Sequence, residues 1–219
     1  MQPLKITFHM RSPVCLSHPW IHFDAILAHL YLRKNYPDYR SLPSKRVVEL
    51  DYDLPLKRSG DVYHASVSFF DVTDYFSTTI YKRFCEKHLD AKRLRKKKID
   101  RGRGKFKDFM IQLIYIPATR VTFYANGDPD EIQDLLKGMA GLGKKTAIGY
   151  GSFRHYEIEE AGRDCSLVMD GKAMRPIPVR MLREYDDVAI LAYKPPYWDV
   201  DGVEECAPPG ANVVLKEVV

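Results

Sequence analysis

The chain opens with apolar and polar residues in alternation, which predicts a strand with one face buried in a core. The alternating apolar residues are Leu4, Ile6, Phe8 and Met10. Apolar residues then recur at helical spacing over residues 21–35, so one stripe of a predicted helix faces the same core. Tyr36-Pro37 ends this helix, because a residue before proline avoids helical backbone angles.

The later elements follow from the same periodicity and from turn residues. Asp128 is predicted to cap a second helix, with Pro129 in its first turn and Glu131 completing a capping box. Gly141 is expected to close that helix in the left-handed conformation. Residues 62–70, 109–116, 120–124 and 153–159 are predicted strands, residues 47–50 a short strand, and residues 81–95 a helix.

The order of these elements is strand, helix, strand, insertion, strand, helix, strand. It predicts an α+β protein with a ferredoxin-like or RRM-like sheet that carries two helices on one face. We expect residues 1–160 to form this domain, with a basic insertion at about residues 71–107. Residues 161–219 are expected to form a C-terminal extension packed on it.

Composition narrows the class of protein. The 219 residues are 45% hydrophobic and 29% charged, which is an ordinary globular mixture. No apolar run reaches the roughly 18 residues of a membrane span, and the N-terminus lacks a signal-peptide core, so we expect a cytoplasmic protein. Structural zinc is disfavoured because the cysteines are scattered, and we expect no metal or cofactor. The cysteines are Cys15, Cys85, Cys165 and Cys206.

Positive charge is concentrated in one segment. Residues 82–107 contain 13 Lys/Arg and 3 Asp/Glu, a net charge of +10 in a chain whose overall charge is +5. A basic segment on an otherwise mildly acidic body is typical of a contact with nucleic acid. Its glycine-interrupted end, residues 101–105, is expected to be a flexible loop. A solvated surface without a ligand is the alternative.

The segment between the second helix and the last strand is rich in glycine and lysine. It reads Gly141-Leu-Gly143-Lys144-Lys145-Thr-Ala-Ile-Gly149-Tyr150-Gly151. A phosphate-binding P-loop needs Ser or Thr at position 145 and a helix after the loop, whereas here the helix comes first. The segment therefore lacks both the residue and the helix position that a phosphate-binding loop of an NTPase requires. The RRM signature fits only at Gly149-Tyr150-Gly151, and a plain helix-to-strand connection with tight turns stays open.

This loop, with the helix before it and the strand after it, resembles the glycine-rich loop of the RAMP superfamily of CRISPR-associated proteins. The run over residues 120–134 resembles that family, as does Ser12-Pro13-Val14-Cys15-Leu16 followed by Trp20-Ile21-His22-Phe23-Asp24. The length and the tail Lys194-Pro195-Pro196-Tyr197-Trp198 are most similar to the small Cas-five-like subunit of type IV effector complexes. The role of Tyr197 and Trp198 is open between subunit contact and core packing.

The resemblance implies a subunit that caps the 5′ repeat-derived handle of a CRISPR RNA. Its expected partners are that RNA, the backbone and large subunits of the effector complex and, indirectly, the target DNA. The basic insertion lies where such proteins often carry a thumb against RNA.

Three groups of residues are candidates for RNA contact. Glycine amides and lysines of the loop approach phosphate closely, and Tyr150 either stacks on a base or is a buried ring. Arg154 and His155 point to opposite faces of a strand, so at most one of them faces RNA. The loop candidates are Gly141, Gly143, Lys144, Lys145, Gly149, Tyr150, Gly151, Arg154 and His155; those of the insertion are Lys96, Lys97, Lys98, Arg101, Arg103 and Lys105; those near the first strand are Arg11, His18, Trp20 and His22.

The histidines leave a second function open. Repeat-processing nucleases of the same superfamily often use a histidine at the place of His18 or His22 to deprotonate a 2′-hydroxyl, and histidine titrates in the range that general acid–base catalysis requires. A metal-independent endoribonuclease is therefore the alternative to a non-catalytic RNA-binding subunit. A structural or RNA-stacking histidine is the simpler interpretation of either residue. A third possibility is an RRM-like adaptor that binds protein through its sheet.

Overall fold

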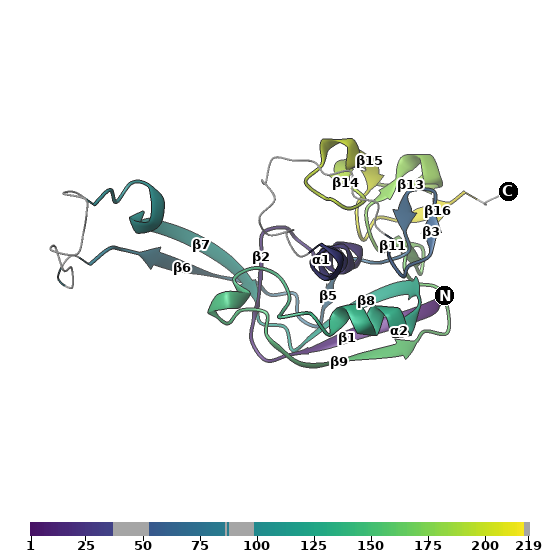
Figure 1. The fold of residues 1–219 in the computed structure, drawn as a ribbon. Helices are drawn as coiled ribbons and strands as arrows, with labels where there is room; N and C mark the ends of the chain where they lie inside the picture. The colour runs from purple at the N-terminus through teal and green to yellow at the C-terminus, as the bar shows by residue number, and fades with distance from the viewer. Residues whose placement is uncertain (37–52, 86, 88–98, 217–219) are drawn as a thin grey trace.

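A computed structural model describes residues 1–36, 53–85, 87 and 99–216 (Figure 1). It combines antiparallel sheets with two α-helices, which confirms the predicted α+β class. The helices are α1 (Phe23–Asn35) and α2 (Pro129–Leu136). The strands are β1 (Gln2–Met10), β2 (Val14–Leu16), β3 (Arg58–Ser59), β4 (Val62–Tyr63), β5 (Phe69–Phe70), β6 (Phe76–Lys82), β7 (Phe109–Ile116), β8 (Arg120–Gly127), β9 (Phe153–Glu160), β10 (Val168–Met169), β11 (Lys172–Ala173), β12 (Ile177–Pro178), β13 (Leu182–Tyr185), β14 (Ala189–Ala192), β15 (Val203–Ala207) and β16 (Val213–Leu215).

The main sheet has four strands in the order β5-β8-β1-β9, and every neighbouring pair is antiparallel. β1 is an inner strand of this sheet. Its alternating apolar side chains are buried on one face, as predicted. Leu4, Ile6 and Phe8 are buried in the main core together with residues of α1 and α2. Lys5, Thr7 and His9 therefore project from the opposite face of the sheet.

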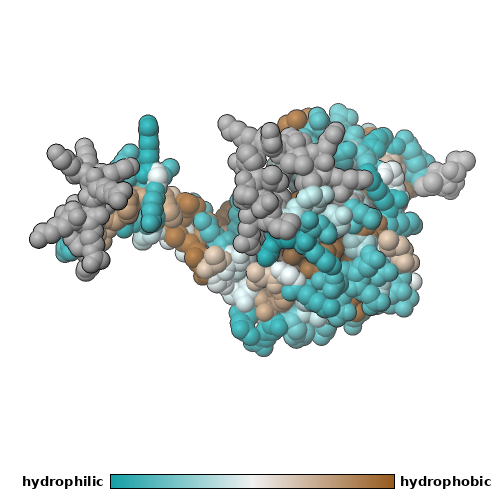
Figure 2. All heavy atoms as spheres, viewed as in Figure 1, coloured by the Kyte–Doolittle hydropathy of each residue, from teal (hydrophilic) through white to brown (hydrophobic). Residues whose placement is uncertain are grey.

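A long hairpin arm projects from this body (Figure 1). β6 and β7 pair along their length, and β7 also pairs with β2, which gives a three-stranded sheet β2-β7-β6. Apolar residues lie on the surface of the arm between the body and its tip (Figure 2). Exposed members of this set are Tyr75, Phe76, Tyr81, Phe109, Met110, Ile111 and Ile114.

The arm differs from the prediction in three ways. The predicted helix at residues 81–95 is wrong at its start, because Tyr81 and Lys82 belong to β6; residues 88–98 lie outside the described residues. The predicted strand at residues 109–116 is found, but it builds the arm instead of the main sheet. The expected loop at residues 101–105 runs into a 3-10 helix at Gly104–Phe106, and Arg101 forms an ion pair with Asp108. The predicted strand at residues 47–50 also lies outside the described residues.

α2 begins as predicted but ends earlier. The Asp128 carboxylate accepts hydrogen bonds from the amides of Asp130 and Glu131, which satisfies the first turn. The helix stops at Leu136, and Gly141 does not adopt the left-handed conformation, so the expected glycine closure is wrong. Among the described residues, neither helix has the length and apolar composition to cross a bilayer.

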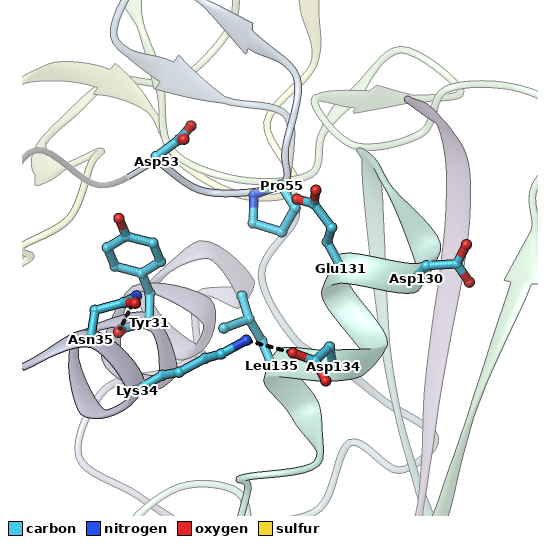
Figure 3. A pocket seen from close by; sticks show the side chains of 9 residues that line it. All are labelled: Tyr31, Lys34, Asn35, Asp53, Pro55, Asp130, Glu131, Asp134 and Leu135. Atoms are coloured by element: carbon cyan, nitrogen blue, oxygen red, sulfur yellow. Dashed lines mark hydrogen bonds and ion pairs between the residues drawn. The ribbon is translucent and has the colours of Figure 1, made fainter.

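A pocket between α1, α2 and residues 53–55 is acidic (Figure 3). One lysine, Lys34, reaches across it and contacts Asp134 at 2.5 Å. The carboxylates in the lining are those of Asp53, Asp130, Glu131 and Asp134. This charge repels phosphate, so the pocket does not suit RNA.

The C-terminal extension is built from short strands around a second core. Its sheets are β10-β11, β12-β15-β14 and β13-β16. Ile177, Cys206 and Ala207 are fully buried there, and Val62 of the N-terminal part joins the same cluster. The extension therefore shares its core with the hairpin β3-β4.

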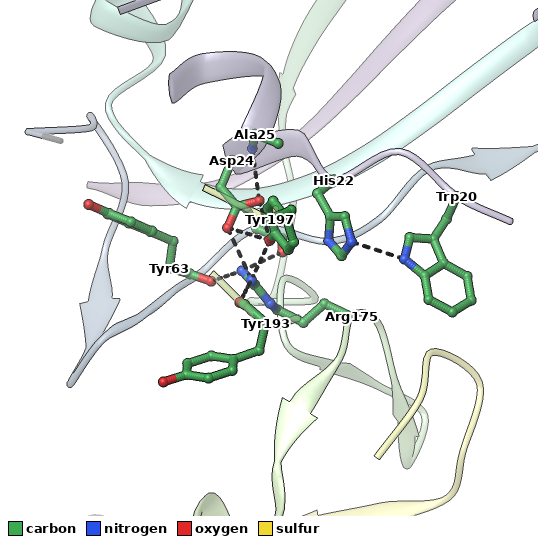
Figure 4. Close-up of polar contacts among 9 residues, drawn as sticks. Trp20, His22, Asp24, Ala25, Tyr63, Arg175, Tyr193 and Tyr197 are labelled. Atoms are coloured by element: carbon green, nitrogen blue, oxygen red, sulfur yellow. Dashed lines mark hydrogen bonds and ion pairs between the residues drawn. The ribbon is translucent and has the colours of Figure 1, made fainter. Parts of the chain in front are cut away.

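One buried ion pair joins the extension to α1 (Figure 4). The side chains of Arg175 and Asp24 are fully buried, and Arg175 Nη2 lies 3.0 Å from Asp24 Oδ2. The guanidinium also donates to the carbonyl oxygens of Tyr63, Ala65 and Tyr193 and to the Tyr197 hydroxyl oxygen. The Tyr197 hydroxyl donates to Asp24 Oδ1 at 2.8 Å. Tyr197 thus packs inside the protein, whereas Trp198 is exposed.

A second polar group lies in the same seam between the two parts. His64 contacts Ser59 Oγ through Nε2 at 2.7 Å and Asp164 Oδ2 through Nδ1 at 3.2 Å. This is the order of hydrogen bonds in a Ser-His-Asp triad. Asp164, however, also accepts hydrogen bonds from Asn126 and Ser166, so it ties the extension to β8. The group thus links the hairpin β3-β4, β8 and the extension through hydrogen bonds.

Arg175→Met is expected to lower the free energy of unfolding by about 3–5 kcal/mol, because it leaves the Asp24 carboxylate buried without a partner. Arg163→Met is the matched control: its ion pair with Asp170 is exposed, and removal costs about 1 kcal/mol or less. Urea denaturation of both variants measures the difference. Equal losses would show that the buried pair does not hold the two parts together.

Asp164 is expected to make stability depend on acidic pH. Burial opposes its ionisation, but hydrogen bonds from His64, Ser166 and Asn126 outweigh burial and hold the pKa of Asp164 well below its ordinary value. Its contribution is complete above the unfolded pKa of about 3.9 and is lost as the pH falls below that value. The gap in urea midpoint between the wild type and Asp164→Asn should be constant from pH 6 to about pH 5 and should begin to narrow as the pH falls to 3, because full loss requires protonation of the folded state. A constant gap over that range would contradict this assignment.

Candidate nucleic-acid interface

The glycine loop, residues 141–151, folds back against the segment between β1 and β2. Leu142 N donates to Gly151 O at 2.9 Å, and Gly151 N donates to Pro13 O at 2.8 Å. A Cβ atom on Gly151 would lie 1.8 Å from Leu142 O, and one on Gly143 would lie 2.4 Å from Cys15 O. The glycines at these two positions are therefore required by close backbone packing.

This packing corrects part of the predicted phosphate site. The amides of Gly149 and Gly151 donate to Thr146 O and Pro13 O, so they are not directed at a ligand. The amide of Lys144 donates to Cys15 O at 2.8 Å. The loop therefore exposes its lysine side chains, whereas these amides are used in its own packing.

Lys144 and Lys145 are both exposed beside the buried thiol of Cys15. Burial raises the pKa of Cys15, and the charges of Lys144 and Lys145 partly oppose that rise. Lys145 has a left-handed backbone, with φ of 62°, which non-glycine residues rarely adopt. The loop thus places two cations next to each other at the base of the arm.

Strand pairing aligns one of these cations with aromatic rings. Lys144 forms a bridge with Cys15, Cys15 pairs with Tyr115, and Tyr115 pairs with Phe76. Residues directly opposite in antiparallel strands project to the same face. The result is a row that runs from an ammonium group to two rings, with the Tyr115 and Phe76 centroids 5.8 Å apart and the rings stacked.

Tyr150 extends this row into a shallow pocket. Its ring centroid lies 6.1 Å from that of Tyr115, and the pocket is lined by Pro13, Thr78, Tyr115, Ile148, Gly149 and Tyr150. Aromatic rings beside cations are typical of sites for single-stranded nucleic acid. Sequence reasoning missed Phe76, Tyr115 and Thr78, because only the β2-β7-β6 pairing brings the arm to the loop.

Arg11 and Arg154 lie at the same end of the sheet as the loop. Arg11 N and Ser12 N both donate to Ser152 O, and the pairing of β1 with β9 shifts register between His9 and Met10. The shift leaves Arg154 as the extra residue of a β-bulge. Both arginines are exposed. His155 instead pairs with His9 on the sheet face that the helices leave open.

The cations of the insertion lie at the far end of the arm. Arg101, Arg103 and Lys105 are exposed there, and Arg101 is ion-paired with Asp108. Lys96, Lys97 and Lys98 lie outside the described residues. The length of the arm therefore lies between these described cations and the glycine loop (Figure 1).

The histidine group belongs to the seam with the extension. Trp20 Nε1 donates to His22 Nε2 at 3.0 Å, and the His22 ring stacks on Tyr197 with centroids 3.8 Å apart (Figure 4). Burial, with the charges of Arg175 and His18, lowers the pKa of His22 to about 2. Its Nε2 lone pair is occupied, so His22 has the features of a structural residue and not of a general base. His18 is exposed.

The geometry thus defines an α+β protein with exposed cations beside aromatic rings on one surface. The family model described as CRISPR type IV associated protein Csf3 matches residues 2–207. The chain belongs to this family. The match confirms the resemblance to type IV CRISPR-associated proteins.

The comparison with solved structures gives a more distant similarity. The chain matches a chain in the cryo-EM structure of the Type III-B Cmr-beta bound to cognate target RNA. Sequence identity is 14%, the TM-score is 0.34, and the match covers 72% of this chain and 60% of that chain. The chain thus spans less than two thirds of its solved relative's length. No curated protein matches the chain in sequence.

Two glycines of the loop should respond differently to alanine. Gly149 has φ of 101° with open space around it, so Gly149→Ala should cost about 1–3 kcal/mol from backbone strain alone. Gly151→Ala adds a clash with Leu142 O and should cost at least about 2 kcal/mol more. Unfolding free energies of the two variants test this. Similar values would show that the loop does not pack as described.

Proposed function

We propose that the chain is a non-catalytic, RNA-binding subunit of a type IV CRISPR effector ribonucleoprotein. Its role is to cap the 5′ repeat-derived handle of the guide RNA. The observation that carries the proposal is the row of Lys144, Tyr115 and Phe76, with Lys145 and Tyr150 beside it. Ammonium groups neutralise phosphates, and rings stack on unpaired bases for about 1–3 kcal/mol each.

The fold supports this assignment. The first, second, third and fourth strands of the main domain correspond to β1, β5, β8 and β9, which gives the spatial order 2-3-1-4. Two helices connect them in the order strand, helix, two strands, helix, strand, with the arm inserted between β5 and β8. We infer a ferredoxin-like, RAMP-type domain at residues 1–160 with the extension at residues 161–219. This order is that of a split βαβ fold.

The arm supports a place in a multi-subunit complex. Its apolar residues are exposed along both strands (Figure 2), and such a surface on a projecting element is typical of a contact with another macromolecule. We propose that the arm contacts the backbone and large subunits and the guide RNA. Target DNA is then engaged indirectly, through the guide, in the cytoplasm.

The non-catalytic assignment is favoured over an endoribonuclease by the surroundings of His22. That imidazole is held neutral between Trp20 and Tyr197. The nuclease alternative would therefore depend on His18, whose side chain is exposed. An adaptor that binds only protein through its sheet would not need the cations of the loop.

RNA binding by the full-length chain tests the proposal. Lys144→Ala/Lys145→Ala should weaken binding to a handle RNA about 10-fold or more, and should reduce the log–log salt slope by about 1.4, or roughly 0.7 per phosphate contact. Lys5→Ala/Lys137→Ala removes two exposed lysines elsewhere and should leave both values unchanged.

The measurement is a filter-binding titration at several salt concentrations, with the RNA also run on a denaturing gel. Unchanged affinity in the loop variant would overturn the site. Cleavage of repeat RNA by the wild type that His18→Ala abolishes would instead support the nuclease.

A further inference from the structure

Two histidines and a glutamate meet on the open face of the main sheet. His9 of β1 pairs directly with His155 of β9, and Thr7 pairs with Glu157. Residues of β1 that face the helices are buried in the main core, so His9 projects to the other side. His155 and Glu157 are two apart on β9 and share that side. None of the three lies in the glycine loop or the aromatic row.

The spacing of their side-chain atoms matches a metal site. His9 Nε2 lies 3.3 Å from Glu157 Oε2, and His155 Nε2 lies 3.3 Å from Glu157 Oε1. Two ligands at roughly 2.0–2.1 Å from a tetrahedral ion are about 3.3 Å apart. One ligand atom from each residue can be chosen so that all three lie within 4.8 Å of one another. Because the two imidazole rings are stacked, the exposed His155 ring has to turn out of the stack to direct its lone pair at the same ion as His9.

The His9 ring has a buried nitrogen atom, Nε2, that lacks a hydrogen-bond partner among the described residues. This atom makes no hydrogen bond within the described part of the chain, although Glu157 Oε2 lies 3.3 Å away. A buried polar atom without a partner costs about 1–3 kcal/mol. Coordination to a metal ion would use the lone pair of this nitrogen.

The neighbourhood brings the two imidazole rings together. The two imidazole rings are stacked, with centroids 4.3 Å apart and planes 15° apart. The β-bulge at His9 and Met10 lies directly beside them, and bulges often direct side chains near sites. Arg120, opposite His9 on β8, is ion-paired with Asp71 at 3.7 Å, which draws its charge toward another carboxylate.

We propose that His9, His155 and Glu157 bind a divalent transition-metal ion of the Zn²⁺ class. Two imidazoles and one carboxylate suit Zn²⁺ better than Mg²⁺ or Ca²⁺, which prefer oxygen ligands. Three protein ligands leave one position of a tetrahedral ion for water or an oxyanion. The proposal differs from the expectation of no metal drawn from the scattered cysteines. The sequence spacing of 146 residues between His9 and His155 gives no metal motif; only the strand register brings them together.

Metal binding by the tag-free full chain tests the proposal. The background is Cys85→Ser, because this exposed thiol would compete for the ion. After chelator treatment and desalting, the protein is titrated with Co²⁺ and followed by visible d–d absorption; equilibrium dialysis then counts bound Zn²⁺. We expect one ion per chain, and a loss of affinity of roughly 10-fold or more in Glu157→Gln and His155→Asn.

Two matched variants control for nonspecific effects. Glu159→Gln changes a carboxylate two residues along the same strand, and His18→Asn removes an exposed histidine elsewhere; both should bind as the background does. Far-UV circular dichroism checks that each variant is folded. Absence of stoichiometric binding, or equal binding by Glu157→Gln, His155→Asn and the controls, would overturn the proposal.

Discussion

The buried ion pair between Arg175 and Asp24 is the contact on which the arrangement of the two parts depends. A guanidinium without solvent is stable only when its charge is paired and most of its donors are satisfied. Both Nη atoms of Arg175 donate hydrogen bonds, whereas its buried Nε has no partner among the described residues. Here a carboxylate from α1, carbonyl oxygens from the segment before β5, and groups from the extension converge on it. Because these partners come from both parts, the pair fixes the extension on the main domain and also fixes the start of α1.

This constraint explains the histidine group near the N-terminus. Tyr197 donates to Asp24 and stacks on His22, and His22 in turn accepts a hydrogen bond from Trp20. Residues that resemble a catalytic cluster in sequence are thus part of the packing around a buried charge. The exposed lysines that we propose for RNA contact lie elsewhere, where the glycine loop meets the base of the arm.

The arm and the loop depend on each other for that surface. The loop cannot carry a side chain at Gly143 or Gly151, because Cys15 O and Leu142 O occupy the space. This close approach places Lys144 in line with β2, β7 and β6, and so with Tyr115 and Phe76. The glycines of the loop therefore allow tight backbone packing, and this packing also sets the position of the lysines.

The sequence by itself determined the local features: the alternation in β1, the capped start of α2 at Asp128, the glycine loop and the family resemblance. These depend on residues close together in the chain. Only the tertiary structure decided that residues 109–116 build an arm, that Tyr115 and Lys144 lie in register on either side of Cys15, and that His9 meets His155 and Glu157. These contacts depend on strand register between distant segments, and the alternation of side chains leaves the choice of partner strand undetermined.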